Sequence, residues 1–315
     1  MTEERKPLLE VEHLVKNFHS GKRGRKVTVN AIDDNSFTIY EGETFGLVGE
    51  SGCGKTTTGR TIIRLYDPSS GTMRFMGREI SGPMTRDLRH FLTDNISMIF
   101  QDPVDSLNPR MTVREIVGEG MKYHGVRDAA EREARVLEML DKVGLTKEHA
   151  SRYPHEFSGG QRQRIGIARA LVVRPKLIIA DEPVSALDVS IQAQVINLLN
   201  DLKEELGLTI MFIAHDLSVV KYFSTRVAVM YYGKIVEMAD SGELYRRPLH
   251  PYTRALLSAV PQPDPLQGKM RARLIYDPVK EQIESADARS MREILPGHFV
   301  YCNEPESARY REMIR

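Results

Sequence analysis

Cysteine, net charge and long apolar runs are all scarce in this sequence. The 315 residues include only two cysteines, Cys53 and Cys302, which are too few and too far apart for a disulfide framework. Lysine and arginine number 44 against 43 aspartates and glutamates, so the net charge is +1. This balance argues against a dedicated nucleic-acid binder, which needs a basic face to offset phosphate charge.

Segments that could target or anchor the chain are also missing. No apolar run approaches the roughly 20 residues that a membrane-spanning helix needs. The first residues, MTEERKPLLEVEHL, are charged and lack the apolar core of a signal peptide. We therefore expect a chain in a reducing cytoplasm, which reaches a membrane only through a partner. Its length allows one large domain or two modest ones.

The order of strand and helix patterns predicts an α/β fold. Between residues 8 and 46, EVEHLVKNF, VTVNAIDD and SFTIYEGE alternate like short strands of a half-buried antiparallel sheet. Further on, the buried-type strands TFGLVG, NISMIF, LIIADE and LTIMFIAHD are separated by helical segments. This alternation indicates a mostly parallel sheet covered on both faces. RVAVMYYGKIVEMA predicts a hairpin that turns at Gly233.

Three segments depart from this alternation. Residues 102–155 are predicted to be a helical insertion, with Gly144 ending a helix whose apolar stripe is Ala130, Ala134, Leu137 and Leu140. SGKRGRK (20–26) is either a solvated hairpin tip or a contact with lipid head groups or a partner. Beyond roughly Tyr245, the sequence predicts one short helix in HPYTRALLS, then proline-rich chain without a clear period.

A P-loop is predicted where a buried strand meets a helix, at GESGCGKT. The glycines let successive backbone N–H groups curve around phosphate oxygens without Cβ clashes. Lys55 is expected to bind the β- and γ-phosphates, and the Thr56 hydroxyl is expected to ligate Mg²⁺. Cys53 occupies a free position of the pattern, and we expect no catalysis from its thiol. The predicted nucleotide contacts are Gly49, Glu50, Ser51, Gly52, Cys53, Gly54, Lys55, Thr56 and Thr57.

An acidic pair follows the buried strand LIIADE. Asp181 ends the strand, where a carboxylate can reach the Mg²⁺ shell. Glu182 comes next and can orient or deprotonate the attacking water. A strand that ends in Asp-Glu is weak evidence alone, but together with a P-loop it indicates nucleotide hydrolysis.

A second anion site is predicted at residues 155–170, HEFSGGQRQRIGIARA. Ser158, Gly159 and Gly160 open a helix there, and the free N–H groups and positive end of a helix attract an anion. The FSGGQ run resembles the LSGGQ signature of the ATP-binding cassette (ABC) ATPases, with Phe157 in the place usually held by leucine.

Four further positions follow the motif order of the ABC family. Gln101 ends a strand as the Q-loop glutamine does, SALD at 185–188 follows the acidic pair as the D-loop does, and His215 ends a strand as the switch histidine does. Phe18 stands where the family places an aromatic residue that stacks on adenine; a place in the core is the other interpretation.

The resemblance covers residues 8–240 and implies the ABC ATPase form of the P-loop NTPase fold. That fold has a RecA-like parallel core, an N-terminal antiparallel β subdomain and a helical signature subdomain, here about 102–165. We expect a nucleotide-binding domain over 1–245 and a C-terminal extension over 246–315.

The resemblance also implies how the site residues act. Two ATPase subunits of this family pack head to tail, so that the signature of one closes over the γ-phosphate held by the P-loop of the other. Ser158, Gly160 and Gln161 are then assigned to the ATP of a second subunit, and Asp188 of the D-loop to the nucleotide site.

The catalytic roles come from the same resemblance. Glu182, His215 and Gln101 are expected to support in-line attack of water on the γ-phosphate. Gln101 is also placed with Thr56 and Asp181 at the Mg²⁺ ion, from where it would pass the state of the γ-phosphate to the helical subdomain.

The sequence resembles one branch of the family most, the ATP-binding subunits of oligopeptide and dipeptide importers. Within this branch it looks most like the F-type ATP-binding subunit of the oligopeptide permeases of Gram-positive bacteria. MIFQDPVDSLNPRMTV, ADEPVSALDVSIQAQVINLL, LYRRPLHPYTRALLSAVPQPDP and PGHFVYCNE carry this resemblance. It implies peptide uptake at the cytoplasmic face of the plasma membrane. The implied partners are a D-type ATPase, two transmembrane permease subunits and an extracellular peptide-binding protein.

Alternatives within and outside this branch stay open. Dipeptides, oligosaccharides or nickel are other cargoes of the branch, because the ATPase does not touch cargo. A soluble ABC ATPase acting on nucleic acid or ribosomes usually has two cassettes or a coiled-coil arm, and an exporter often fuses the cassette to membrane helices. Many branch members hold an iron–sulfur cluster with several tail cysteines; this tail has only Cys302, so we expect no cluster.

Overall fold

The computed structural model describes most of the chain, namely residues 5–20, 27–102, 106–259, 274–281 and 287–314. The basic loop at 21–26 and the proline-rich chain at 260–273 lie outside the described residues. The ends of the chain and two short segments, 103–105 and 282–286, lie outside them as well.

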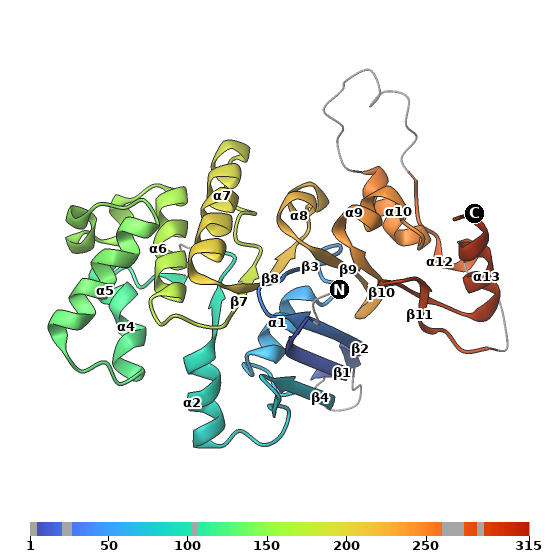
Figure 1. The fold of residues 1–315 in the computed structure, drawn as a ribbon, viewed down its shortest axis with the longest axis horizontal. Helices are drawn as coiled ribbons and strands as arrows, with labels where there is room; N and C mark the ends of the chain where they lie inside the picture. Colours follow the sequence, from blue (N-terminus) through green and yellow to red (C-terminus); the bar gives the residue numbers. More distant parts are fainter. Residues whose placement is uncertain (1–4, 21–26, 103–105, 260–273, 282–286, 315) are drawn as a thin grey trace.

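An eight-stranded sheet lies at the centre of the protein (Figure 1). In spatial order its strands are β11 (Ser290–Leu295), β12 (His298–Cys302), β10 (Lys234–Asp240), β9 (Arg226–Tyr231), β3 (Thr44–Val48), β8 (Thr209–Ala214), β7 (Leu177–Asp181) and β6 (Ile96–Ile99). The strands from β9 to β6 run parallel, whereas β10, β12 and β11 join in antiparallel pairs. The predicted parallel core is therefore present.

Both faces of the parallel sheet are buried. Neighbouring residues of one strand, such as Leu47 and Val48, belong to two different apolar clusters on opposite faces, and Met211 and Phe212 repeat this division. All four side chains have no exposed surface. This burial on both sides explains why the parallel strands are continuously apolar in sequence.

A second, four-stranded antiparallel sheet contains the N-terminal strands. Its order is β2 (Val27–Tyr40), β1 (Pro7–Ser20), β4 (Ser70–Phe75) and β5 (Arg78–Glu79). The prediction of three short strands is wrong here, because VTVNAIDD and SFTIYEGE form one strand. Asp34 takes a φ of 57°, and the side chain of Asn35 donates to Gly233 O (2.8 Å) and accepts from Ile235 N (2.7 Å). Asn35 therefore connects the middle of β2 to the turn between β9 and β10, and the strand continues through it.

The helices surround the main sheet, and those of the insertion and of the C-terminal part lie at opposite ends of the view in Figure 1. They are α1 (Lys55–Ile62), α2 (Arg86–Asn95), α4 (Val113–Tyr123), α5 (Ala129–Lys142), α6 (Gly159–Leu171), α7 (Val189–Leu206), α8 (Leu217–Phe223), α9 (Ser241–Arg246), α10 (Pro251–Ser258), α12 (Pro278–Glu281) and α13 (Glu304–Glu312), with 3₁₀ turns at Lys147–Ser151 and Pro154–Glu156. No helix in the described part is long and apolar enough to cross a membrane.

The helical insertion is present, but its buried face differs from the prediction. Ala130 and Ala134 on α5 are not buried, whereas Val136, Met139 and Leu140 are. The larger side chains cover more apolar area than alanine does, and they set which face of the helix packs inward. Gly144 follows the helix with a φ of 73°, as its predicted role as a stop requires.

The C-terminal part has more regular structure than the sequence indicated. The hairpin of β11 and β12 extends the main sheet, with Val300 opposite Glu237 of β10. The C-terminal part has a small hydrophobic core of its own, formed by Leu249, Ile294, Val300, Cys302 and Tyr310. These two strands are short and carry polar residues on their exposed face, so their sequence shows no clear alternation. Hydrogen bonding of β12 to β10 makes them part of the main sheet.

Candidate nucleotide-hydrolysis site

The P-loop connects β3 to α1, as predicted. Two of its glycines are required by close backbone contacts. A Cβ on Gly49, at φ 155°, would lie 2.2 Å from Met230 O, and one on Gly54, at φ 113°, would lie 2.1 Å from Ala31 O. Neither position can hold a larger residue without moving the main chain, so the glycines fix the path of the loop.

Lys55 begins α1 and points back into the loop. Its side chain is 3% exposed, and Nζ donates to Gly49 O at 2.8 Å and to Glu50 O at 3.0 Å. The same atom lies 3.9 Å from Glu182 Oε1. A buried ammonium surrounded by carbonyl oxygens and a carboxylate is well placed to bind an anionic phosphate group.

Thr56 and Asp181 form a pair of oxygen donors. The Thr56 hydroxyl donates to Asp181 Oδ1 at 2.8 Å, whereas the buried Asp181 Oδ2 has no hydrogen-bond partner among the described residues. Burial raises the pKa of the Asp181 carboxyl. A hydroxyl and a buried carboxylate with a free oxygen are the ligands that Mg²⁺ prefers, so the residues fit the predicted metal role.

Two polar side chains converge on one carboxylate oxygen of a third. Glu182 Oε2 accepts a hydrogen bond from Gln101 Nε2 at 3.2 Å and lies 3.1 Å from His215 Nδ1. Gln101 follows β6, Glu182 follows β7 and His215 follows β8, so adjacent parallel strands bring them to one edge of the sheet. Glu182 has a φ of 46°, and its N–H donates to Ile213 O, which fixes where its side chain starts.

These residues share one cavity of about 580 Å³ beside the P-loop. It is lined by Val29, Asn30, Ala31, Ser51, Gly52, Cys53, Gly54, Lys55, Thr56, Thr57, Gln101, Glu182, His215, Tyr232 and Gly233. Gly49 and Glu50 contribute through their carbonyl contacts to Lys55. Cys53 is buried, and burial raises the pKa of its thiol, which favours the neutral form.

Phe18 does not line this cavity but lies next to a residue that does. It sits on β1 directly opposite Val29, and its ring packs edge-on against Tyr66 with 5.2 Å between ring centroids. Lys16 Nζ lies 4.9 Å from the centre of the same ring. Phe18 therefore stands next to the cavity wall, and its stacking on adenine stays a prediction.

The signature lies outside the P-loop cavity of its own chain. Ser158 caps α6 in a capping box, where its Oγ accepts from Gln161 N at 3.4 Å and its N–H donates to Gln161 Oε1 at 3.1 Å. Ser158 is exposed and Gly160 half-buried, and a Cβ on Gly160 would lie 2.7 Å from Ile191. Asp188 is exposed at the start of α7. The exposed signature is consistent with contact to another molecule.

Sequence reasoning missed two tyrosines at this site. Tyr232 lines the cavity and is 77% exposed, and the Tyr252 hydroxyl accepts a hydrogen bond from Glu50 N at 3.1 Å. Tyr232 precedes the hairpin turn at Gly233, and Tyr252 belongs to the short helix α10. Neither carries a phosphate-binding pattern, and only the packing of distant segments brings them to the P-loop.

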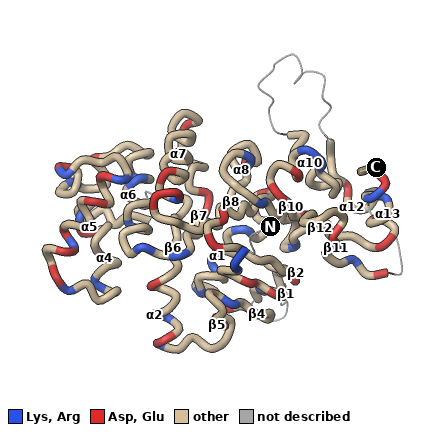
Figure 2. Tube along the Cα trace, viewed as in Figure 1, with Lys and Arg blue, Asp and Glu red and all other residues tan. Residues whose placement is uncertain are grey.

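Cys302 and the charge distribution do not point to other chemistry. Cys302 is fully buried, and burial raises the pKa of its thiol to about 11. Positive and negative residues are interspersed over helices and strands alike, as Figure 2 shows. The absence of an iron–sulfur cluster and of nucleic-acid binding both remain predictions.

A phosphate cradle, a magnesium-type oxygen pair and a carboxylate held by glutamine and histidine define a P-loop nucleotide hydrolase. The family model described as ABC transporter matches residues 32–185, and that of the oligopeptide/dipeptide transporter C-terminal region matches 236–284. Together with a curated relative that is 58% identical over 95% of this chain, these matches show that the chain belongs to the ABC transporter family, as an ATP-hydrolysing member. The predicted family and fold class are confirmed.

Curated relatives extend over the whole chain. An oligopeptide transport ATP-binding protein OppF of Bacillus subtilis is 58% identical and covers 95% of this chain and 97% of its own length. The OppF of Streptococcus mutans is 56% identical over 99% of this chain and 100% of its own. The dipeptide transport ATP-binding protein DppF of Lactococcus lactis is 52% identical, with 99% of both chains covered.

Solved structures share the fold of the ATPase part. A dimeric ATP-binding cassette in a post-hydrolysis state with ADP and phosphate has a TM-score of 0.67 at 30% identity and covers 74% of this chain and 99% of its own. The cbiO1 protein of Clostridium perfringens has a TM-score of 0.68 at 29% identity, with 76% of this chain and 91% of its own covered.

Proposed function

We propose that this chain is the motor subunit of a bacterial importer that takes up oligopeptides, and that it works at the cytoplasmic face of the plasma membrane. The names of the OppF relatives and the match of the C-terminal region support this cargo class. The observation that carries the motor role is the single cavity shared by Lys55, Glu182 and His215.

The nucleotide in this proposal is ATP with Mg²⁺. Lys55 and the P-loop amides hold its phosphates, and Thr56 with the free Oδ2 of Asp181 holds the ion, which supplies charge neutralisation at the phosphates. Gln101, also predicted at the ion, donates to Glu182 in the structure. Phe18 and Tyr232 are aromatic side chains near enough to the cavity to contact the base.

Glu182 is the proposed acceptor of the proton from the attacking water. Gln101 and His215 hold its Oε2 from two sides, and Oε1 faces Lys55 at 3.9 Å. These contacts fix the carboxylate before reaction, so less reorganisation is needed when water attacks.

A second ATPase subunit completes the site in this proposal. Ser158, Gly160, Gln161 and Asp188 lie outside the cavity of their own chain, and a solved relative is a dimer with ADP and phosphate. We propose a D-type partner, two permease subunits and an extracellular peptide-binding protein. The proposed nucleotide-binding domain spans 1–245 and the extension 246–315, although β12 of the extension pairs with β10.

Import of dipeptides is the second candidate, because a DppF protein is 52% identical over nearly the whole chain. Uptake of labelled dipeptides and hexapeptides separates the two. Cells whose own gene is deleted are complemented with wild-type chain or with Glu182→Gln. We expect the wild-type chain to restore hexapeptide uptake and Glu182→Gln not to restore it. Restored uptake of dipeptides only would favour the second candidate, and uptake with Glu182→Gln equal to wild type would refute the motor role.

A further inference from the structure

The C-terminal extension reaches the P-loop through one tyrosine. Tyr252 of α10 is 3% exposed, and its hydroxyl accepts the hydrogen bond of the Glu50 amide at 3.1 Å. The residue lies within the region that matches the oligopeptide/dipeptide transporter C-terminal model. The contact therefore joins the part of the chain that is particular to this branch to the phosphate-binding loop.

The Glu50 amide belongs to a peptide group that is held from two sides. Its N–H donates to Tyr252, and the carbonyl of the same peptide, Gly49 O, accepts from Lys55 Nζ at 2.8 Å. Because a peptide group is planar, the two bonds together fix its orientation.

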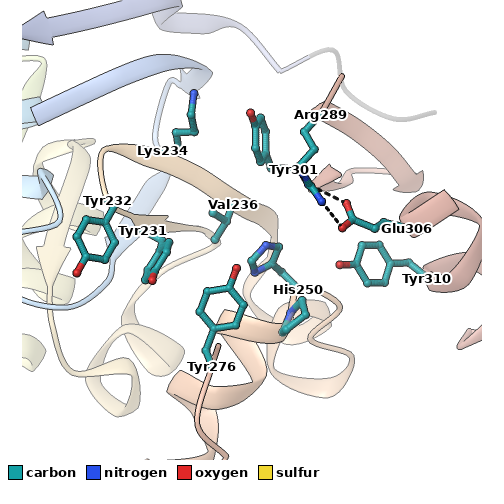
Figure 3. A pocket seen from close by; sticks show the side chains of 11 residues that line it. Tyr231, Tyr232, Lys234, Val236, His250, Tyr276, Arg289, Tyr301, Glu306 and Tyr310 are labelled. Atoms are coloured by element: carbon teal, nitrogen blue, oxygen red, sulfur yellow. Dashed lines mark hydrogen bonds and ion pairs between the residues drawn. The ribbon is translucent and has the colours of Figure 1, made fainter. Parts of the chain in front are cut away.

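Aromatic packing fixes the Tyr252 ring. Its centroid lies 4.4 Å from that of Tyr231 and 5.7 Å from that of Tyr276, and the latter two are 5.2 Å apart. Figure 3 shows Tyr276 beside His250 at the wall of an adjoining cavity, which Tyr231 also lines. Packing against these two rings restricts the Tyr252 side chain and so fixes where its hydroxyl lies.

A buried carboxylate fixes the backbone that carries Tyr252. Glu237 of β10 has no exposed surface, and it accepts from Leu249 N at 2.8 Å and from His250 N at 3.0 Å. His298 Nε2 of β12 lies 2.7 Å from the same carboxylate, and His250 Nδ1 accepts from Tyr252 N. The Glu237 carboxylate thereby connects the start of α10 to two neighbouring strands, β10 and β12.

We propose that Tyr252 is a positioning residue of the nucleotide site, through which the extension holds the first turn of the P-loop ready for phosphate. This rests on the proposed ATP site. Loss of the hydroxyl leaves the Glu50 amide without its partner, and the loop then samples conformations that do not bind phosphate.

The test is Tyr252→Phe in the full chain, which keeps the ring and removes the oxygen. We expect the dissociation constant for Mg-ATP to rise up to about tenfold, as the net loss of one hydrogen bond gives. In the assembled ATPase pair, KM should rise while kcat stays within about twofold. Hydrogen exchange of the peptide that contains Glu50 should accelerate, with α10 and β12 unchanged.

Tyr310→Phe is the matched control, since Tyr310 is a buried tyrosine of the same extension with 4% exposure. It should leave ATP affinity unchanged. An unchanged affinity in Tyr252→Phe overturns the inference, and so does a loss accompanied by faster exchange throughout α10 and β12. Failure of the wild-type chain itself to bind ATP would instead refute the proposed function, so the two failures can be told apart.

Discussion

At the scale of single residues, the site depends on side chains at the ends of neighbouring parallel strands. Gln101, Glu182 and His215 follow β6, β7 and β8, and the P-loop follows β3. Glu182 lies at the centre, since Lys55 faces one carboxylate oxygen while Gln101 and His215 face the other. Each of the two charged groups, Lys55 and Glu182, can be tested alone.

Glu182→Gln should separate binding from hydrolysis. An amide cannot take a proton from water, and general bases contribute about 10²- to 10⁴-fold to a rate, so phosphate release should fall at least about 100-fold. ATP should still bind and trap a closed dimer, visible by size-exclusion chromatography. Glu41→Gln, a change at an exposed carboxylate paired with Lys6, is the control. Near wild-type phosphate release would remove Glu182 from the mechanism.

Lys55→Ala should strongly weaken nucleotide binding. The buried ammonium is replaced by a methyl group, and charge-assisted hydrogen bonds of about 1.5–3 kcal/mol each are lost, which weakens binding about 10- to 100-fold or more. Calorimetric titration with Mg-ATP measures this. Lys234→Ala removes a half-exposed ammonium paired with Asp33 and should bind as wild type does. Equal affinity of Lys55→Ala and wild type would refute the P-loop assignment.

At the scale of elements, two helix starts connect the motifs to the fold. Ser158 caps α6, where the signature lies, and His250 caps α10, where Tyr252 lies. At the second start the cap is an imidazole, 6% exposed, whose Nδ1 accepts from Tyr252 N. A proton on Nδ1 would break this bond and place a cation at the positive end of a helix.

The His250 cap predicts acid sensitivity. Burial lowers the pKa of His250 from 6.5 to about 4. Between these values the unfolded chain binds a proton that the folded chain does not, so stability falls as pH drops from 6.5 to 4, by up to about 3 kcal/mol at about 1.4 kcal/mol per pH unit. Urea unfolding at a series of pH values measures the slope.

His250→Asn is the matched variant for this prediction. The asparagine side chain can also accept the N-cap hydrogen bond from the backbone, but it does not titrate. The variant should therefore lose less stability between pH 6.5 and pH 4 than wild type loses. The same slope in both proteins would exclude His250 as the cause.

At the scale of the whole molecule, the proposed function gives the chain two halves of different sites. The described lining of the P-loop cavity contains no residue of the signature, and Ser158 is exposed at the start of α6. The C-terminal extension continues the main sheet at its other edge, beyond β10. The exposed signature is the surface that the proposed function assigns to a second ATPase. The extension contacts the P-loop of its own chain through the hydrogen bond between Tyr252 and the Glu50 amide.

The chain alone should bind ATP but hydrolyse it poorly. A missing set of donors around a phosphate typically costs about 10²- to 10³-fold in rate. Addition of the proposed D-type partner should raise phosphate release about 100-fold in a coupled assay at low protein concentration. Ser158→Ala should lower the activity of the mixture and leave ATP affinity of this chain unchanged. Full activity of the monomer would overturn the two-half-site proposal.

Local sequence predicted those parts of the site whose chemistry follows chain order. The P-loop, the acidic pair, Gln101 and His215 all sit at strand ends, and a buried strand with a polar residue after it is visible in sequence. The structure brings these residues into one cavity, as the motifs indicated, except that Asp181 reaches it through Thr56. Their roles in binding and catalysis stay predictions.

Tertiary packing decided what has no local pattern. Asp34 and Asn35 look like the end of a strand, but the contacts of Asn35 to the β9–β10 turn keep one strand continuous. The buried face of α5 follows the larger side chains that meet α4 and α6. The hairpin of the extension forms because β10 offers an edge, and Tyr252 reaches Glu50 across 202 residues of chain. Such contacts depend on distant partners, so sequence alone leaves them undetermined.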